Sequence, residues 1–215
     1  MSKPVIVMGG GGHALMVVDV LRQLEIEILA IVSRDSLKKC TVFDGIKTLH
    51  EDNVMLDFSS TEICLVNGIG SMPGSRVRAT LFDYYKKDNF EFLSVISPSS
   101  VISAHAHISE GAQVLHGAIV NAGATIGDNS IINTGAIVEH ECSVGKNNHI
   151  APGASLCGSV TTGDFVHIGT GANVIQGVKI GDNSTVGAGA TLTRDLHSNT
   201  TIYVARPFCI EGITK

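Results

Sequence analysis

The sequence predicts a small α/β region followed by a long β-solenoid, and two observations lead to this fold class. Residues 101–196 divide into sixteen consecutive hexads without insertion or deletion, and fifteen of them carry Ile, Val or Leu at the second position. The preceding residues, 1–97, alternate short apolar runs with stretches of helical apolar spacing. We therefore place the boundary between the two expected domains at 97/98, with the second domain running from 98 to 215.

A period of six residues matches neither the period of 2 of a plain strand nor the 3.6 of a helix. Each hexad predicts one short strand and one turn, and three hexads close a triangular coil whose apolar column points inward. Residues eighteen apart then lie above one another on adjacent coils, roughly 4.8 Å apart. Thr162 is the one exception in the apolar column. A β-sandwich is disfavoured because its strands recur every 8–12 residues or so with variable loops.

The N-terminal region reads as a Rossmann-like arrangement with a small parallel sheet, in which buried strands alternate with helices. Apolar runs predict strands over residues 4–8, 26–33, 62–67 and 90–96. Helical spacing predicts helices over residues 14–24 and 75–87. A Ser-Pro-Ser stretch at 97–99 separates these elements from the hexads.

Composition and charge exclude several classes of partner. The net charge of −5 and the absence of a basic run argue against nucleic acid. No stretch approaches the roughly 18 apolar residues of a membrane span, and the N-terminus lacks the pattern of a signal peptide. The five cysteines are scattered without CxxC spacing, so we expect free thiols in a cytoplasmic protein: Cys40, Cys64, Cys142, Cys157 and Cys209.

The glycine run 9–12, between the first strand and the first helix, is typical of a phosphate site. A helix N-terminus supplies free N–H groups, and glycines let phosphates approach the backbone. Gly9, Gly11 and Ala14 also match the G-x-G-x-x-A dinucleotide fingerprint. A region of this length cannot hold both halves of a dinucleotide-binding domain, so a single nucleotide diphosphate is favoured, and a tight turn without a ligand stays the alternative.

His140 is a candidate base within the hexads. Stacking places Ala122 and Gly158 on either side of it, which predicts open space for an acyl group over the imidazole. The Gly158 N–H is then available to polarise a carbonyl, and the adjacent Glu141 can orient the ring. From the residues alone His140 is one candidate among six histidines in this region: His105, His107, His116, His140, His149 and His167.

Two other chemistries are disfavoured. His149 and His167 lie one coil apart, but no carboxylate or cysteine at ligand spacing completes a metal site, so no metal is predicted. Cys142 and Cys157 lie near His140 along the fold, but neither has an activating arrangement for a nucleophile.

Two stretches together carry a family resemblance: the Gly9–His13 run and residues 131–142, of which NTGAIVEHE is the most specific part. They resemble the bacterial nucleotide-sugar acetyltransferases of the hexapeptide-repeat family over nearly the whole chain. These enzymes N-acetylate 4-amino-sugars of bacillosamine, perosamine and viosamine type, and sialic-acid O-acetyltransferases are relatives. The resemblance implies a left-handed parallel β-helix, a homotrimer, acetyl-CoA as co-substrate and a role in O-antigen or surface-polysaccharide biosynthesis.

The resemblance also implies roles for individual residues. His140 would be the general base, supported by Glu141. The nucleotide sugar would be held by Gly11, Gly12, His13, Asp35, Gly68 and Asn133. Acetyl-CoA would lie between adjacent subunits against His149, Gly158 and Ala188. Ala188 stands where the family often has Gly, and residues 205–208 replace a common Gly-x-Pro-Ala-Lys ending, so the CoA contacts stay open.

The resemblance predicts direct acyl transfer, in which His140 takes a proton from the attacking sugar amine. Backbone N–H groups of the coil and His149 are the candidate donors to the tetrahedral oxyanion. Two alternatives remain at this stage: O-acetylation of a sialic-acid-type sugar, and a non-catalytic solenoid that binds a nucleotide sugar. The sequence does not choose between UDP, dTDP and GDP.

Overall fold

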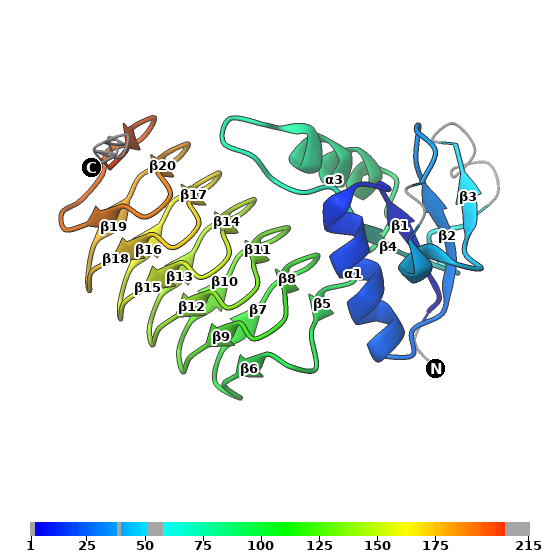
Figure 1. Ribbon diagram of the computed structural model, residues 1–215, viewed down its shortest axis with the longest axis horizontal. Helices are drawn as coiled ribbons and strands as arrows, with labels where there is room; N and C mark the ends of the chain where they lie inside the picture. Colours follow the sequence, from blue (N-terminus) through cyan, green and yellow to red (C-terminus); the bar gives the residue numbers. More distant parts are fainter. Residues whose placement is uncertain (1–2, 38–39, 51–57, 205–215) are drawn as a thin grey trace, which may run out of the picture.

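The computed structural model describes residues 3–37, 40–50 and 58–204. An α/β region and a β-solenoid lie end to end, as expected (Figure 1). The unusual ending at residues 205–208 lies outside the described residues. Within the described residues, no helix has the length and apolar character needed to cross a membrane.

The N-terminal sheet is parallel, with strand order β3-β2-β1-β4. Its strands are β1 (Val5–Met8), β2 (Ile28–Val32), β3 (Lys47–Leu49) and β4 (Cys64–Asn67). The helical elements are α1 (Gly12–Gln23), the 3-10 turn η1 (Thr41–Phe43) and α3 (Val77–Lys87). The structure confirms the expected helices and first three strands to within a few residues, and it adds β3, which the sequence analysis did not predict.

The single strand expected over residues 90–96 is wrong. Phe92 makes only an isolated bridge to Leu65, at the edge of the N-terminal sheet. The chain then leaves that sheet, and β5 (Val95–Ile96) pairs with the first coils of the solenoid instead. One continuous apolar run therefore serves two sheets, because tertiary pairing and not local propensity decides where its backbone bonds.

The solenoid confirms the hexad reading: a two-residue strand stands at the first two positions of each hexad. The coil strands are β6 (Val101–Ile102), β7 (His107–Ile108), β8 (Gln113–Val114), β9 (Ile119–Val120), β10 (Thr125–Ile126), β11 (Ile131–Ile132), β12 (Ile137–Val138), β13 (Ser143–Val144), β14 (His149–Ile150), β15 (Ser155–Leu156), β16 (Thr161–Thr162), β17 (His167–Ile168), β18 (Asn173–Val174), β19 (Lys179–Ile180), β20 (Thr185–Val186), β21 (Thr191–Leu192) and β22 (Thr201–Ile202).

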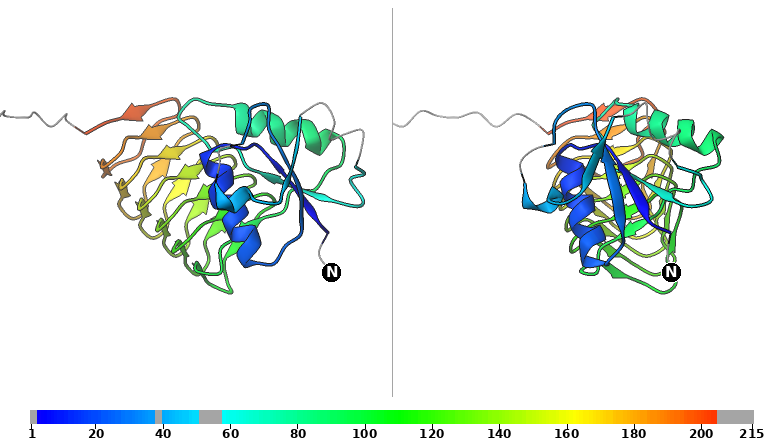
Figure 2. Two further views of the ribbon diagram at one scale, coloured as in Figure 1. Left: turned by 45° about the vertical axis from the view of Figure 1, so that its right-hand side comes forward. Right: turned by 90° about the vertical axis from the view of Figure 1, so that its right-hand side faces the viewer.

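Together with β5, these strands form three parallel sheets of seven, six and five strands, which are the three walls of the triangular coil. Paired residues such as Ile132 and Ile150 are eighteen apart, so the stacking rule holds. The register changes at the last coil, where Thr185 pairs with Thr201 and the separation drops to sixteen. Figure 2 shows the stack of coils from two further sides.

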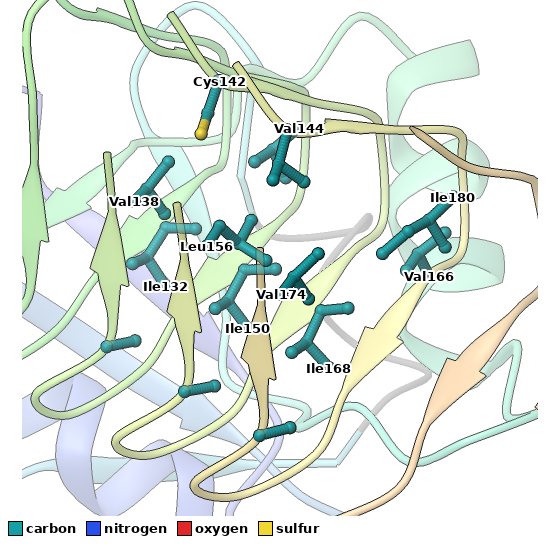
Figure 3. Packing of buried hydrophobic residues seen from close by; sticks show 14 of the residues in the cluster. Ile132, Val138, Cys142, Val144, Ile150, Leu156, Val166, Ile168, Val174 and Ile180 are labelled. Carbon is teal, nitrogen blue, oxygen red and sulfur yellow. The ribbon is translucent and has the colours of Figure 1, made fainter. Parts of the chain in front are cut away.

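The apolar column fills the interior of the coil with Val, Ile and Leu side chains that are almost completely buried (Figure 3). Thr162, the exception in this column, is buried too. Its Oγ1 accepts hydrogen bonds from the Asn148 Nδ2 at 2.6 Å and from the Gly145 N–H at 3.1 Å. The exception is tolerated because its hydroxyl is hydrogen-bonded to a buried asparagine.

The two regions share a hydrophobic core. Val5, Val7 and Leu21 of the α/β region form one buried cluster with Leu115 and Ile131 of the solenoid. Helix α1 lies between the N-terminal sheet and the first coils (Figure 1). This packing fixes the carboxyl ends of β1 and β4 against the seven-stranded wall of the solenoid, where the candidate site is found.

Candidate functional site

A cavity of about 570 Å³ lies at the carboxyl ends of β1, β2 and β4. We call it the glycine-loop pocket; its walls are residues 9–13, 33, 35–36 and 68–72. In open α/β sheets, ligands bind in this crevice outside the carboxyl ends of the strands. Among the residues expected to hold a nucleotide sugar, five line the pocket: Gly11, Gly12, His13, Asp35 and Gly68.

The glycines of this pocket divide into two kinds. Gly9 has a φ of +110°, and Cβ atoms added at Gly10 and Gly68 would lie 2.8 Å from the Ser33 Oγ and 2.9 Å from the Gly9 carbonyl oxygen. The fold itself requires glycine at positions 9 and 68, because of the positive φ and the close backbone, whereas at Gly10 the added Cβ would meet the side chains of Leu37 and Ser33. At Gly11 and Gly12 an added Cβ would meet nothing within 4 Å. The fold leaves open space there, as expected where a ligand approaches the backbone.

Helix α1 begins beside this open space. Gly11 is its N-cap residue and makes no side-chain capping bond, and the first turn carries no acidic residue. The first N–H groups of a helix have no partner within it, and the helix dipole makes this end positive. The pocket therefore offers backbone donors that suit a phosphate or another anion.

His13 forms a fixed and neutral wall of the pocket. Its Nε2–H donates to the Gln113 Oε1 of the solenoid at 2.6 Å. Burial and, secondarily, the charge of Arg78 lower the pKa of His13 to about 4. The imidazole is therefore uncharged at neutral pH and is not a cationic phosphate ligand.

His149 and Asn133 form a hydrogen-bonded chain that reaches the pocket wall. The His149 Nδ1–H donates to the Ser71 carbonyl at 3.0 Å, and the Asn133 Nδ2 donates to the His149 Nε2 at 3.0 Å. Burial first, then the neighbouring His167, lowers the pKa of His149 to about 3. With both nitrogens engaged, His149 has no N–H left in this conformation for the oxyanion contact expected from the sequence. Asn133 adjoins the pocket without lining it.

His140 lies on a corner of the solenoid, in the turn between β12 and β13. Its side chain is 60% exposed, and its Nδ1 lies 3.3 Å from the Glu141 Oε2. The Ser159 hydroxyl donates to the same carboxylate oxygen at 3.4 Å. We call this group, with Ala122 and Gly158, the His140 corner. Its geometry gives an imidazole whose Nδ1–H is held by a carboxylate and whose Nε2 can accept a proton.

Gly158 is covered by the imidazole of His140. A Cβ at this position would lie 2.6 Å from the His140 Nε2, so the imidazole itself fills the space that the glycine leaves. The prediction of an open acyl site on this side of the ring is therefore wrong. The Gly158 N–H donates no hydrogen bond within the part of the chain that the structure describes. It is available as a donor beside the imidazole, as expected.

The His140 corner and the glycine-loop pocket are not brought together within one chain. His140 lies between the six-stranded and five-stranded walls, whereas His149 and Gln113 belong to the seven-stranded wall against the pocket. Ala188 is exposed at a third place, the corner between β20 and β21. The expected site residues thus form two separate groups, with Ala188 apart from both.

The other candidate groups carry no site. Among the described residues, no cluster of three or more His, Cys, Asp or Glu side chains could hold a metal ion. His149 and His167 meet edge to face, with ring centroids 4.9 Å apart. Burial raises the pKa of the Cys142 thiol, whose Sγ donates to the Cys157 carbonyl at 3.1 Å. A thiol in that environment is a poor nucleophile.

The repeats and the two groups of site residues define a hexapeptide-repeat transferase. The family model described as bacterial transferase hexapeptide (six repeats) matches residues 123–158 and 159–194. Curated proteins give no match. Solved structures resemble the chain over almost its full length.

Three of these structures are informative. A histidine-to-alanine mutant of GDP-perosamine N-acetyltransferase from Caulobacter crescentus, in complex with CoA and GDP-perosamine, is 33% identical, with a TM-score of 0.81 and 92% of each chain covered. The acetyltransferase domain of PglB from Neisseria gonorrhoeae, in complex with acetyl coenzyme A, is 28% identical, with a TM-score of 0.83 and coverage of 94% of this chain and 96% of that one. WeeI from Acinetobacter baumannii is 25% identical, with a TM-score of 0.73 and coverage of 92% and 95%.

The chain belongs to the bacterial nucleotide-sugar acetyltransferases of the hexapeptide-repeat, left-handed β-helix family. The family resemblance read from the glycine run and the NTGAIVEHE stretch is thereby confirmed, and so are the fold class and the enzyme class. The solenoid is a left-handed parallel β-helix, and the protein is an acetyltransferase.

Proposed function

We propose that the protein transfers the acetyl group of acetyl-CoA to the 4-amino group of a nucleotide-linked amino-deoxysugar. One observation carries the proposal: an exposed imidazole paired with a carboxylate, beside a free backbone N–H, on the solenoid of a nucleotide-sugar acetyltransferase. The similarity to a GDP-perosamine N-acetyltransferase that holds CoA and GDP-perosamine supports an amine acceptor and a CoA donor.

His140 is the proposed general base. The Glu141 carboxylate holds its Nδ1–H, which leaves the Nε2 lone pair free to accept the proton that the sugar amine loses as it attacks the thioester carbonyl. The Ser159 hydroxyl, which also bonds Glu141, keeps the carboxylate in place. Transfer is direct: the amine nitrogen bonds to the acetyl carbon, the C–S bond breaks, and the proton held by His140 passes to the departing CoA thiolate, so no acyl-enzyme is needed.

The Gly158 N–H is the proposed donor to the oxyanion that develops on the thioester carbonyl. It lies beside the imidazole and has no acceptor among the described residues. A donor of this kind is worth roughly 10²–10³ in kcat when it is correctly placed. The base and the donor thus come from stacked positions on adjacent coils.

The glycine-loop pocket is the proposed site for the nucleotide diphosphate. Gly11 and Gly12 leave room for phosphates at the N-terminus of α1. Asp35 follows β2 and lines the same pocket, so its carboxylate is in place to accept hydrogen bonds from ribose hydroxyls. The sugar would extend from the pocket toward Ser71 and the Asn133–His149 pair.

We further propose a homotrimer in which the His140 corner of one subunit faces the glycine-loop pocket of the next. The motivation is that one chain holds the two groups on different walls of the solenoid. Packing three solenoids side by side supplies the second wall that an acyl donor needs. His149 and Ala188 would then border acetyl-CoA, and Asn133 would border the nucleotide sugar.

The reaction is tested by measuring thiol release from acetyl-CoA with a panel of UDP-, dTDP- and GDP-linked 4-amino-sugars. We expect turnover with at least one of them and an N-acetyl product by mass spectrometry. Transfer to hydroxyl acceptors such as a sialic acid, but to no amine, would contradict the proposal. Nucleotide-sugar binding without any thiol release would contradict catalysis altogether.

The shared site is tested by subunit mixing. His140→Ala lowers kcat and Gly11→Val raises KM for the nucleotide sugar, so at low nucleotide-sugar concentration each impairs a different half of the site. Trimers reassembled from both variants should regain part of the activity, because some interfaces then contain two intact halves. Light scattering should give the mass of a trimer. A monomer at working concentration, or no regain of activity on mixing, would contradict the interfacial site.

A further inference from the structure

Arg78 is a buried cation at the junction of the two regions. It lies on α3 and is only 5% exposed. Its guanidinium donates to the carbonyls of Asn67 and Ile69 at 3.0 and 2.6 Å, and to the carbonyl of Asn129 at 3.0 Å. The remaining nitrogen, Nη2, is buried and has no hydrogen-bond partner within the described part of the chain.

This charge is not neutralised by the described protein. Every hydrogen bond that the guanidinium makes there goes to a backbone carbonyl, and none goes to a carboxylate. Burial lowers the pKa of Arg78 to about 9, so the side chain is still protonated at neutral pH. A buried charge without a counter-ion is costly, and its retention calls for a functional reason.

The glycine-loop pocket offers a place for a counter-ion beside Arg78. Its lining contains no Lys or Arg, although an anion is proposed to bind there. Arg78 lies directly behind this lining, since it bonds the carbonyl of Ile69, a wall residue, and its charge depresses the pKa of His13, another wall residue. At this depth its positive potential acts on the pocket with little screening by solvent.

The bond to Ile69 also sets the direction of the next N–H group. A trans peptide is planar, with its C=O and N–H pointing in opposite directions, and the described residues contain no cis peptide. Because the Ile69 carbonyl faces the buried guanidinium, the Gly70 N–H faces the other way. Gly70 lines the pocket, and its N–H donates no hydrogen bond to any described residue. By contrast, the Gly68 N–H donates a hydrogen bond to the Met8 carbonyl at 2.9 Å.

We propose that Arg78 is a positioning residue for the diphosphate of the nucleotide sugar: it turns the Gly70 N–H toward the phosphates and supplies their buried counter-charge without touching them. The inference rests on the proposed function of the glycine-loop pocket. It assigns the pocket two sets of donors, the N-terminus of α1 on one side and Gly70 on the other, with the cation behind the second.

The test compares Arg78→Lys with Arg22→Lys. Lysine keeps the charge at position 78 but lacks the planar fork that spans three carbonyls. Arg22 is the matched control, because it also bonds backbone carbonyls, those of Val42 and Asp44 at 2.9 and 2.6 Å, away from the pocket. Calorimetry measures Kd for UDP, dTDP, GDP and the corresponding nucleosides, and kinetics measure KM for the nucleotide sugar and for acetyl-CoA.

We expect Arg78→Lys to raise the Kd of the bound diphosphate about tenfold, as for one lost bond to a charged group. The Kd of the nucleoside and the KM of acetyl-CoA should change little, and Arg22→Lys should change none of these values. An equal rise in the Kd of the diphosphate and of the nucleoside would overturn the role proposed for Arg78 but not the proposed function of the pocket. If no diphosphate binds even the wild-type protein, the proposed function falls, and this inference falls with it.

A measurement on the wild-type protein makes the test independent of whether the variant folds. In protein labelled with ¹⁵N-glycine, the Gly70 amide resonance should shift when the diphosphate that binds is added. The nucleoside alone should leave it in place. If the Gly70 amide resonance does not shift on addition of a diphosphate that is known to bind, the inference is overturned.

Discussion

The glycine-loop pocket and the His140 corner are built in opposite ways. The pocket is concave, its donors belong to the backbone, and its histidine is half-buried and uncharged. The corner is convex, its groups are side chains, and the imidazole is largely exposed until something covers it. The difference matches the proposed division between binding and chemistry: loops at strand ends shape a hollow, whereas the coils hold the imidazole and carboxylate in a fixed position.

Removing the imidazole breaks the corner and leaves the pocket intact. We expect His140→Ala to lower kcat by about 10²–10⁴, the usual worth of positioned proton transfer. KM for both substrates should change little, because the base is not needed to bind them. The loss should shrink at high pH, where more of the sugar amine is already deprotonated. Near-full kcat at neutral pH would place the base elsewhere, with His149 or His13 the next to test.

Gly158→Ala displaces the imidazole without removing it. The new Cβ would stand 2.5 Å from the His140 Cε1, so the ring has to move. Displacement of about 1 Å costs around 10²-fold, and we expect a fall in kcat of that order. The matched control is the same change in a His140→Ala background, where it should cost nothing further. Additive losses in the double variant would show that Gly158 acts independently of the ring.

Gly11→Val breaks the pocket and leaves the corner intact. An added side chain at Gly11 has room in the fold, since its Cβ meets nothing within 4 Å and φ is −83°. We therefore expect an unchanged Tm. KM for the nucleotide sugar should rise at least about tenfold as phosphate contacts are lost, and KM for acetyl-CoA should not. Equal effects on both substrates would contradict the assignment of the pocket.

The half-buried His149 beside the pocket gives the smallest effect, which is an effect on stability. The pKa of His149 is about 3 in the fold against 6.5 for an ordinary histidine. Below pH 6.5 the unfolded chain therefore binds more protons than the folded protein. The contribution of His149 to the free energy of unfolding is complete above pH 6.5 and declines as the pH falls. Between pH 6.5 and 5 the loss is at most about 2 kcal/mol.

The variant His149→Gln keeps one donor and one acceptor for Ser71 and Asn133 while removing the titrating group. Its free energy of unfolding, measured by urea denaturation, should fall less between pH 6.5 and 5 than that of the wild-type protein. Parallel curves for the two proteins would show that His149 does not carry this pH dependence.

The solenoid was predictable from the sequence because its contacts follow from a fixed period. Once eighteen residues make one coil, the stacking of His140 on Gly158 needs no further information. The sequence did not reveal what fills the space beside Gly158, since a glycine next to a histidine is compatible with an empty space and with a ring packed against the glycine. The strand β3 was missed because Lys47 and Thr48 are exposed and leave a single buried residue, Leu49, as a signal.

The long-range contacts around the pocket do not follow from any sequence period, so they could not be predicted in this way. His13 meets Gln113 across a separation of 100 residues, and Arg78 meets Asn129 across 51. Gln113 stands at an outward position of its hexad, where polar residues are ordinary, and only the packing of the α/β region buries it. Arg78 likewise reads as a surface residue of an amphipathic helix until the solenoid covers it.

The core shared between the regions also determines how the protein unfolds. Leu115 and Ile131 pack with Val5, Val7 and Leu21, so neither region can lose its structure without exposing apolar surface on the other. Solenoids with independent coils can melt by fraying from one end. Here the α/β region covers the first coils, and we expect the two to form one cooperative unit. Calorimetry should therefore give a single transition for these coils and the α/β region together, and a chain cut at 97/98 should not yield two stable halves.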